Sequence, residues 1–328
     1  MQKENELKRI LEEVRTQMST TLLSYEERDP RGFKWGSPSY NGNCSGKVPL
    51  GFIDKLKAKS VCELFAGSGT LSDVCRDYSI PYVGIDLNPN PIRDNIYSMD
   101  ITNMNEDLPD GFYEADMCFS HPPYPGLNHV KYAGSAWKDT KNLASRDIQN
   151  MQFEQGMKLI NLSTMRAYSA LPSGSYMVIL VGEIRANGRF YSMMQNLALP
   201  GEHFQTYVKL QHNTWSGRQT YSGSSNPRAL TAHEMIAVIK KPSGYELAYV
   251  IPRRYAMDIR DSIGTATWKD VVHAVMEKLG GKANLSEIYA EISGHKKCET
   301  NPHWKEKVRQ TLQMGRYTSD GNGLWAAA

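Results

Sequence analysis

The stretch "VCELFAGSGTLSDVC", residues 61–75, joins a short apolar run, a turn of small residues and a helical pattern. Gly67 and Gly69 remove the side chains that would keep a ligand away from the backbone, and a following helix would point its free N–H groups at the same place. We therefore predict a strand, a ligand-binding turn and a helix. Ser72 stands where a dinucleotide fingerprint would have its third glycine, which disfavours a nicotinamide or flavin cofactor.

Short apolar runs alternate with helical patterns beyond this stretch. Further strands are predicted at "YVGIDL" (82–87), "IYSMDI" (96–101), "ADMCFS" (115–120), "YMVILVG" (176–182), 203–211 and 233–240, and helices near 70–78, 90–96 and 146–171. Parallel strands need crossover helices, which cover both faces of a sheet. The alternation therefore predicts an α/β domain with a mostly parallel sheet.

The two ends of the chain have a different character. Residues 3–25 carry apolar residues at helical spacing and predict an amphipathic helix. Residues 267–279, 284–293 and 302–314 predict three short helices, and "GRYTSDGNGLW" (315–325) predicts two strands about a glycine turn, which is the outline of a winged helix. We expect a lead-in at 1–38, the main domain at 39–252, a linker at 253–264 and the winged helix at 265–328.

Composition excludes several classes of protein. The formal net charge of +3 permits a local nucleic-acid surface but no wrapping of a polyanion. The five cysteines are scattered with no C-x-x-C pair, so we expect no disulfide framework and no metal site. The first thirty residues lack the apolar core that a signal peptide has, and no apolar run of the sequence is long enough for a membrane span. We expect a cytoplasmic protein that does not bind membranes.

Acidic residues follow the predicted strands at the ligand-binding edge. Asp86 ends the strand after the glycine turn, where a carboxylate can accept both hydroxyls of a ribose. Asp100 follows the next strand and could reach an adenine amino group. Glu63 would complete a polar rim, although it could equally cap a neighbouring helix.

With these residues in place, the chain resembles the S-adenosylmethionine-dependent methyltransferases. "ELFAGSGT" (63–70) looks like their cofactor loop and "GIDLNP" (84–89) like their ribose-binding segment. The resemblance implies a Rossmann-like fold with a mostly parallel seven-stranded sheet. It also implies a cofactor site made by Glu63, Phe65, Ala66, Gly67, Ser68, Gly69, Thr70, Asp86, Leu87, Asp100 and Ile101. More loosely, "YNGNCSGKVPLGFIDKL" (40–56) resembles a segment beside the methionine end of the cofactor, with Asn43, Cys44 and Ser45 lining it, or else is a plain loop.

A second motif, "FSHPPYPG" (119–126), follows the predicted fourth strand at the same edge. Prolines fix φ and lack N–H donors, so the segment presents carbonyls. Methylation of an exocyclic amino group needs rigid acceptors for the amino hydrogens, which the Pro122 carbonyl and the side chain of His121 could supply. Pro123 would add rigidity, and Tyr124 would stack on a base swung out of its helix. The plainer alternative is a rigid turn.

This segment resembles the [Asp/Asn/Ser]-Pro-Pro-[Tyr/Phe/Trp] motif of amino methyltransferases that act on adenine N6 or cytosine N4. His121 departs from the motif. A neutral imidazole can accept a hydrogen bond but an imidazolium cannot, so we expect activity to fall as the pH drops through the His121 pKa. The chain has no Pro-Cys dipeptide, which excludes the cytosine C5 reaction of resembling enzymes.

The resemblance implies a site-specific DNA methyltransferase with double-stranded DNA as its partner, associated with the nucleoid. Adenine N6 is the first choice; cytosine N4, RNA methylation and a catalytically weak DNA-binding protein stay open, as do a homodimer and a restriction or defence partner. DNA contacts are expected from polar and aromatic loop residues of the main domain, for which ordinary surface loops are the alternative. They are also expected from basic residues of the winged helix, for which the alternative is a protein-docking module. The residues expected to contact DNA are Arg185, His212, Asn213, Trp215, Arg218, Lys305, Lys307, Arg309 and Arg316.

Overall fold

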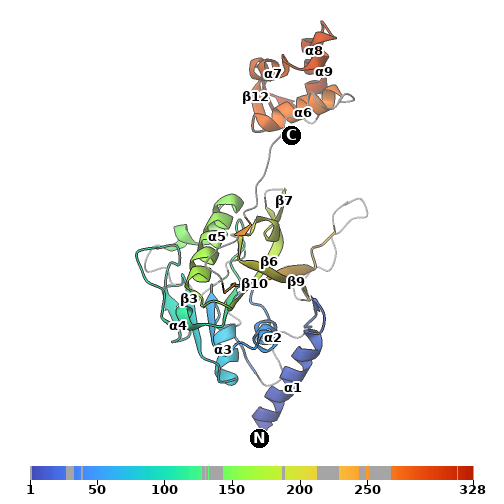
Figure 1. The fold of residues 1–328 in the computed structure, drawn as a ribbon. Coiled ribbons are helices and arrows are strands. Elements are labelled where there is room, and N and C mark those ends of the chain that lie inside the picture. Colours follow the sequence, from blue (N-terminus) through green and yellow to red (C-terminus); the bar gives the residue numbers. More distant parts are fainter. Residues whose placement is uncertain are drawn as a thin grey trace. The chain divides into compact units, whose positions relative to one another are not determined.

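The chain forms two compact units, Met1–Pro252 and Arg253–Ala328, which are described separately (Figure 1). The computed structural model describes residues 2–26, 33–37, 40–127, 130, 132, 143–186, 189–212, 229–243, 249–250, 267–315 and 317–327. The expected lead-in packs on the first unit, because Ile10 and Val14 of its helix are buried in that core. The expected linker 253–264 lies outside the described residues.

The first unit is built on a Rossmann-like mixed sheet. Among the described residues the sheet has nine strands in the order β1-β9-β10-β6-β5-β2-β3-β4, with β7 beside β6. Their bounds are β1 Leu22–Leu23, β2 Val61–Leu64, β3 Tyr82–Asp86, β4 Ile96–Ser98, β5 Met117–Ser120, β6 Tyr176–Ala186, β7 Arg189–Ser192, β9 Glu202–Leu210 and β10 His233–Lys240. Seven strands were expected from the sequence, and the two additional ones are the short strands β1 and β7. The sheet is mostly parallel, but β10 is antiparallel to both of its neighbours.

Strand order creates the binding edge. The chain runs outward from β2 through β3 to β4 and then returns to place β5 on the other side of β2. Leu64 pairs with both Ile85 and Ser120, so β2, β3 and β5 end at the same edge. In open α/β sheets, ligands bind at the carboxyl ends of strands where the strand order reverses.

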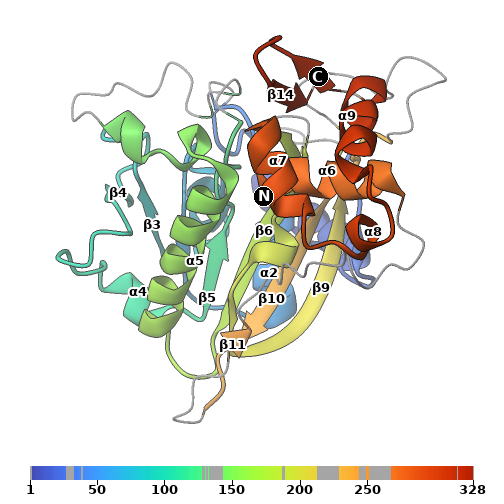
Figure 2. The ribbon, with the colours of Figure 1, turned by 90° about the horizontal axis from the view of Figure 1, so that it is seen from above.

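Helices cover both faces of this sheet, as Figures 1 and 2 show. One core joins the sheet to α1 (Gln2–Gln17), α2 (Lys47–Leu56) and α3 (Thr70–Asp77), and the other joins it to α4 (Gly111–Glu114) and α5 (Phe153–Ala170). Successive side chains of a strand point to opposite faces of the sheet, so they pack in different cores. Val61, for example, lies in the first core and Cys62 in the second. Short elements complete the unit: η2 Leu143–Arg146, η3 Ile148–Asn150, η4 Met194–Asn196 and the pair β8 Leu199–Pro200 with β11 Tyr249–Val250.

Three predicted helices differ in extent or kind. The helix expected at 90–96 is wrong: the chain there makes turns, with the backbone N–H of Asn90 donating to the Asn88 side chain, before β4 begins. The N-terminal helix ends at Gln17, and Leu22 lies in β1, which pairs with β9. The helix expected at 146–171 begins only at Phe153, after two short 3₁₀ helices.

The second unit has its own small core. It contains α6 Trp268–Lys278, β12 Lys282–Asn284, α7 Leu285–Ile292, α8 Lys296–Glu299, α9 Trp304–Met314, β13 Tyr317–Ser319 and β14 Leu324–Ala327. The three helices and the hairpin predicted from sequence are present. Strand β12 and helix α8 are additional, and the described strands pair in the order β12-β14-β13. Capping boxes start α6 at Thr267 and α7 at Asn284.

Candidate active site

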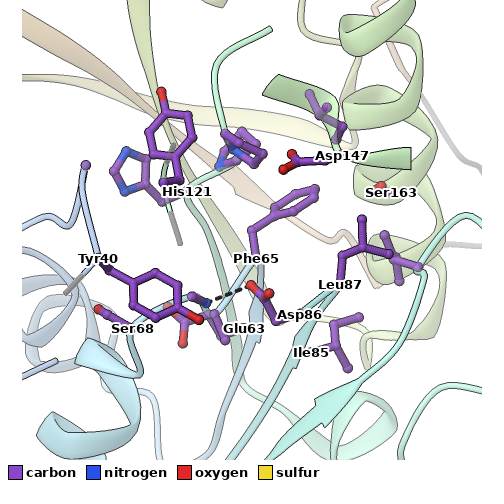
Figure 3. Close-up of a pocket in the computed structure, with 18 of the residues that line it drawn as sticks. Tyr40, Glu63, Phe65, Ser68, Ile85, Asp86, Leu87, His121, Asp147 and Ser163 are labelled. Carbon is purple, nitrogen blue, oxygen red and sulfur yellow. Dashed lines mark hydrogen bonds between the residues drawn. The ribbon is translucent and has the colours of Figure 1, made fainter. Parts of the chain in front are cut away.

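A single pocket at the carboxyl edge of the sheet brings the two sequence motifs together (Figure 3). Most of the predicted cofactor residues line it, as do three of the four residues of His-Pro-Pro-Tyr, the centre of the second motif. These lining residues are Asn43, Cys44, Glu63, Phe65, Ala66, Gly67, Ser68, Thr70, Asp86, Leu87, Asp100, Ile101, His121, Pro122 and Pro123. Within the described part of the chain, the lining does not include Ser45, Gly69 or Tyr124. The pocket therefore joins the glycine turn to the His-Pro-Pro segment.

The glycine turn has an unusual backbone. Phe65, Gly67 and Gly69 have φ values of +58°, +47° and +71°. This left-handed region strains most residues with a Cβ but suits glycine, which explains the two glycines. Phe65 directly follows the last residue of β2, and α3 begins at Thr70. The N–H of Gly67 faces Asp86 across the strand ends.

Asp86 lies where a carboxylate acceptor was predicted. One carboxylate oxygen accepts from the Gly67 N–H at 2.8 Å and the other from the Asn88 N–H at 2.8 Å (Figure 3 shows the first bond). Burial raises the pKa of Asp86, and these two backbone bonds oppose the rise. A carboxylate offers about four acceptor positions. Two therefore stay available for hydroxyl groups of a ligand in the pocket.

Glu63 is buried at the base of the pocket and accepts a hydrogen bond from the Tyr82 hydroxyl, rather than capping a helix. Burial raises its pKa to about 8, although the Tyr82 bond acts in the opposite direction. At neutral pH the Glu63 carboxyl is therefore mostly protonated. A cationic group placed beside it would favour the ionised form.

Arg146 and Asp147 were not predicted from the sequence but line the same pocket. Arg146 pairs with Asp100 at 2.5 Å and also donates to Thr102 at 2.9 Å. The second oxygen of Asp100 accepts from the backbone and side chain of Thr102. If Asp100 binds an adenine amino group as expected, its carboxylate has to do so while it is also paired with Arg146.

The segment before α2 closes one side of the pocket. Tyr40 is buried and accepts from the Asn88 side chain at 2.5 Å. Asn43 donates to the carbonyls of Ser37 and Tyr40, which folds the segment back on itself. Cys44 is buried, and burial raises its pKa to about 12, so it stays a neutral thiol. Ser45 faces α2 instead, where its hydroxyl accepts from the Lys47 N–H.

Tyr124 is anchored in the sheet. A Cβ on Gly182 would lie 2.6 Å from the Tyr124 ring, so the ring packs directly on the β6 backbone. The Tyr124 hydroxyl donates to Glu234 at 2.5 Å, and its backbone N–H donates to the Tyr132 hydroxyl at 3.3 Å. Stacking on a flipped base stays a prediction, and it would have to use a ring already held on one side.

Glu234 is a further site residue that sequence reasoning missed. It lies on β10 opposite Lys209 of β9, and the Lys209 ammonium binds its carboxylate at 2.6 Å. Burial alone would raise the pKa of Glu234, but Lys209, His121 and the Tyr124 hydrogen bond together outweigh burial, and the pKa falls to about 2. Lys209 lies near the end of β9 and Glu234 near the start of β10, and nothing in the sequence itself pairs the two.

His121 is held neutral by its surroundings. Burial lowers its pKa to about 4; the nearby Glu234 carboxylate opposes this and the Lys209 ammonium adds to it. The imidazole can therefore accept a hydrogen bond across the whole neutral range. The loss of activity that the sequence predicts at low pH is therefore expected near pH 4.

The predicted DNA-contacting residues lie in several places. Arg185 is exposed at the end of β6 and stacks over Phe190, and the ring of His212 contacts the Ser24 hydroxyl at 3.0 Å. In the second unit, Lys305, Lys307 and Arg309 are exposed on α9. Asn213, Trp215, Arg218 and Arg316 lie outside the described residues.

No cluster of three or more His, Cys, Asp and Glu side chains among the described residues is arranged as metal ligands would be. No helix in the described ranges has the length and apolar character that crossing a bilayer requires.

No protein-family model matches the sequence, and no curated protein is significantly similar to it. Solved structures resemble part of the chain. TrmN from Thermus thermophilus matches over 61% of this chain and 50% of its own, with 14% identity and a TM-score of 0.37. A SAM-dependent methyltransferase from Archaeoglobus fulgidus matches over 60% and 95%, with 12% identity and a TM-score of 0.33.

Human N-acetylserotonin methyltransferase, solved in complex with SAM, matches over 46% of this chain and 37% of its own, with 13% identity and a TM-score of 0.27. This chain thus spans half the length of TrmN and about a third of the human protein.

Proposed function

We propose that the chain is an S-adenosylmethionine-dependent methyltransferase that methylates the exocyclic amino group of a flipped base in double-stranded DNA, with adenine N6 favoured. One observation carries the proposal. The glycine turn with its acids and the His-Pro-Pro segment line one continuous pocket at the edge where such sheets bind ligands. A methyl donor and an amino acceptor could therefore occupy adjoining parts of one site.

The residues present suit the cofactor. Asp86 has acceptor positions to spare for the two ribose hydroxyls, and the apolar Leu87 and Ile101 suit the faces of an adenine ring. Glu63 would bind the amino end of the cofactor as it ionises. When bound, S-adenosylmethionine supplies an electrophilic methyl group on a sulfonium.

His121 and Pro122 would bind the target amino group. An exocyclic amino nitrogen has its lone pair delocalised into the ring, so it becomes nucleophilic only when its hydrogens are held and it pyramidalises. The uncharged His121 ring can accept one hydrogen and the Pro122 carbonyl the other. The proton that leaves the nitrogen after methylation can pass to water, because His121 is too weakly basic to keep it at neutral pH.

The second unit supports DNA as the substrate. Its three main helices and hairpin have the order of a winged helix, and α9 carries Lys305, Lys307 and Arg309 on its exposed surface. Helices at this position in helix-turn-helix proteins enter the major groove, and their basic residues contact phosphates. Target recognition would then be shared between the two units.

The test is methyl transfer from labelled S-adenosylmethionine to double-stranded DNA. Wild type should label DNA, His121→Ala and Asp86→Ala should not, and Tyr113→Ala should behave as wild type because Tyr113 is exposed on α4 away from the pocket. Digestion to nucleosides and mass analysis then identify the base. If the product is N4-methylcytosine, cytosine N4 is the target in place of adenine N6. If RNA is labelled in place of DNA, RNA is the substrate. If the protein binds DNA without methyl transfer, it is a catalytically weak DNA-binding protein.

A further inference from the structure

Three neighbouring strands bring a carboxylate and an ammonium together behind His121. Glu234 of β10 pairs in register with Gly182 of β6 and Lys209 of β9, so these positions share one face of the sheet. The Lys209 ammonium lies 2.6 Å from the Glu234 carboxylate, and the two side chains are only 12% and 7% exposed. An ion pair this shielded from water acts strongly on nearby groups.

Tyr124 links this ion pair to His121. Its hydroxyl donates its only hydrogen to one Glu234 oxygen at 2.5 Å, and the same oxygen lies 3.9 Å from His121 Nε2. The Tyr124 oxygen itself lies 3.5 Å from Nε2. Both atoms that face Nε2 are therefore acceptors. A neutral imidazole carries one hydrogen, and this environment favours it on Nε2, which leaves the lone pair on Nδ1.

The charges around the ring balance. A lone carboxylate near an imidazole stabilises the imidazolium, which cannot accept a hydrogen bond. Lys209 offsets the Glu234 charge from β9, and burial disfavours a charged ring. Among the described residues, the other titratable groups nearby are the Tyr124 and Tyr132 phenols and the Cys44 thiol, which all stay neutral because burial raises each pKa.

We propose that the Lys209–Glu234 ion pair is a positioning element that holds His121, directly and through Tyr124, as the neutral tautomer protonated on Nε2. Nδ1 is then the atom that accepts a hydrogen of the target amino group. The first statement concerns the protein alone, and the second rests on the proposed function.

The test is nitrogen NMR of the full chain with ¹⁵N-labelled histidine, in which the His121 signals are those lost in His121→Asn. Wild type should show Nε2 protonated and Nδ1 unprotonated from about pH 6 to 8. Lys209→Met should raise the His121 titration midpoint by about 1–3 pH units, because Glu234 then acts uncompensated. Lys209→Met with Glu234→Gln should return it towards wild type. Lys240→Met, at the far end of β10, is the matched control and should not move it.

Three results would overturn the proposal: protonation on Nδ1 in wild type, no rise in Lys209→Met, or an equal rise in the double variant. Circular dichroism checks folding, because removing one partner of a buried pair is destabilising. If Lys209→Met does not fold, Glu234→Gln takes its place as the test. The His121 titration midpoint should fall in this variant, and a rise would contradict the proposal. These spectra need no substrate. Absence of methyl transfer with the expected spectra would refute the proposed function and leave the tautomer assignment standing.

Discussion

Replacing Gly182 with alanine tests whether the sheet backbone holds Tyr124. The added Cβ would lie 2.6 Å from one ring carbon and 2.9 Å from both Cζ and the hydroxyl oxygen of Tyr124. Carbon contacts this short force the ring to move. Because the hydroxyl is tied to Glu234 at 2.5 Å, the ring cannot swing aside without lengthening that hydrogen bond.

The expected cost follows from two opposing effects. Overpacking of this kind costs about 1–3 kcal/mol, while replacing glycine within a strand gains roughly 0.5–1 kcal/mol of backbone entropy. We expect a net loss of about 1–2 kcal/mol in the free energy of unfolding of the first unit. In a Tyr124→Ala background the added Cβ no longer meets the ring, so only the gain in backbone entropy from replacing glycine is left. The effect of Gly182→Ala should therefore change sign between the two backgrounds.

Differential scanning calorimetry measures this cycle, because it can separate the unfolding of the two units. Gly294→Ala is the control, since a Cβ there meets open space and the backbone is not left-handed. Methyl transfer by Gly182→Ala should also fall about 10²-fold, because a displaced Tyr124 shifts the neighbouring proline carbonyls. A loss of stability that persists in the Tyr124→Ala background would refute the reasoning.

Three other predictions concern the cofactor pocket and α9. Asp86→Ala should weaken S-adenosylmethionine binding by about 10²-fold or more in titration calorimetry, because two hydrogen bonds to a charged acceptor are lost. Cofactor binding at pH 7 should release up to about one proton, because a cation beside Glu63 lowers its pKa from about 8; calorimetry in buffers of different ionisation enthalpy should show this release vanish well above pH 8. Lys307→Ala and Arg309→Ala should each reduce the salt dependence of DNA binding by about one phosphate contact, whatever the DNA sequence.

The cofactor half of the site could be predicted because its parts are local in sequence. A strand, a glycine turn and a helix occupy residues 61–75, and Asp86 ends the next strand. Each acid at a strand end therefore meets the turn once the strands are parallel neighbours. Arg146 could not be placed this way, because it reaches Asp100 from the last position of a short 3₁₀ helix, where the periodicity predicted the first residue of one long helix.

The surroundings of His121 depend on strand order, which periodicity does not reveal. Glu234 and Lys209 are 25 positions apart in the sequence, and their pairing becomes evident only once β10 is found between β6 and β9. This arrangement also gives a physical reason for the departure at position 121. An aspartate there would set a second carboxylate near Glu234 in a site shielded from water, and two like charges so placed raise each other's pKa. A neutral imidazole avoids that repulsion and still offers an acceptor, so histidine at 121 and the Lys209–Glu234 pair behind it are best understood as one unit.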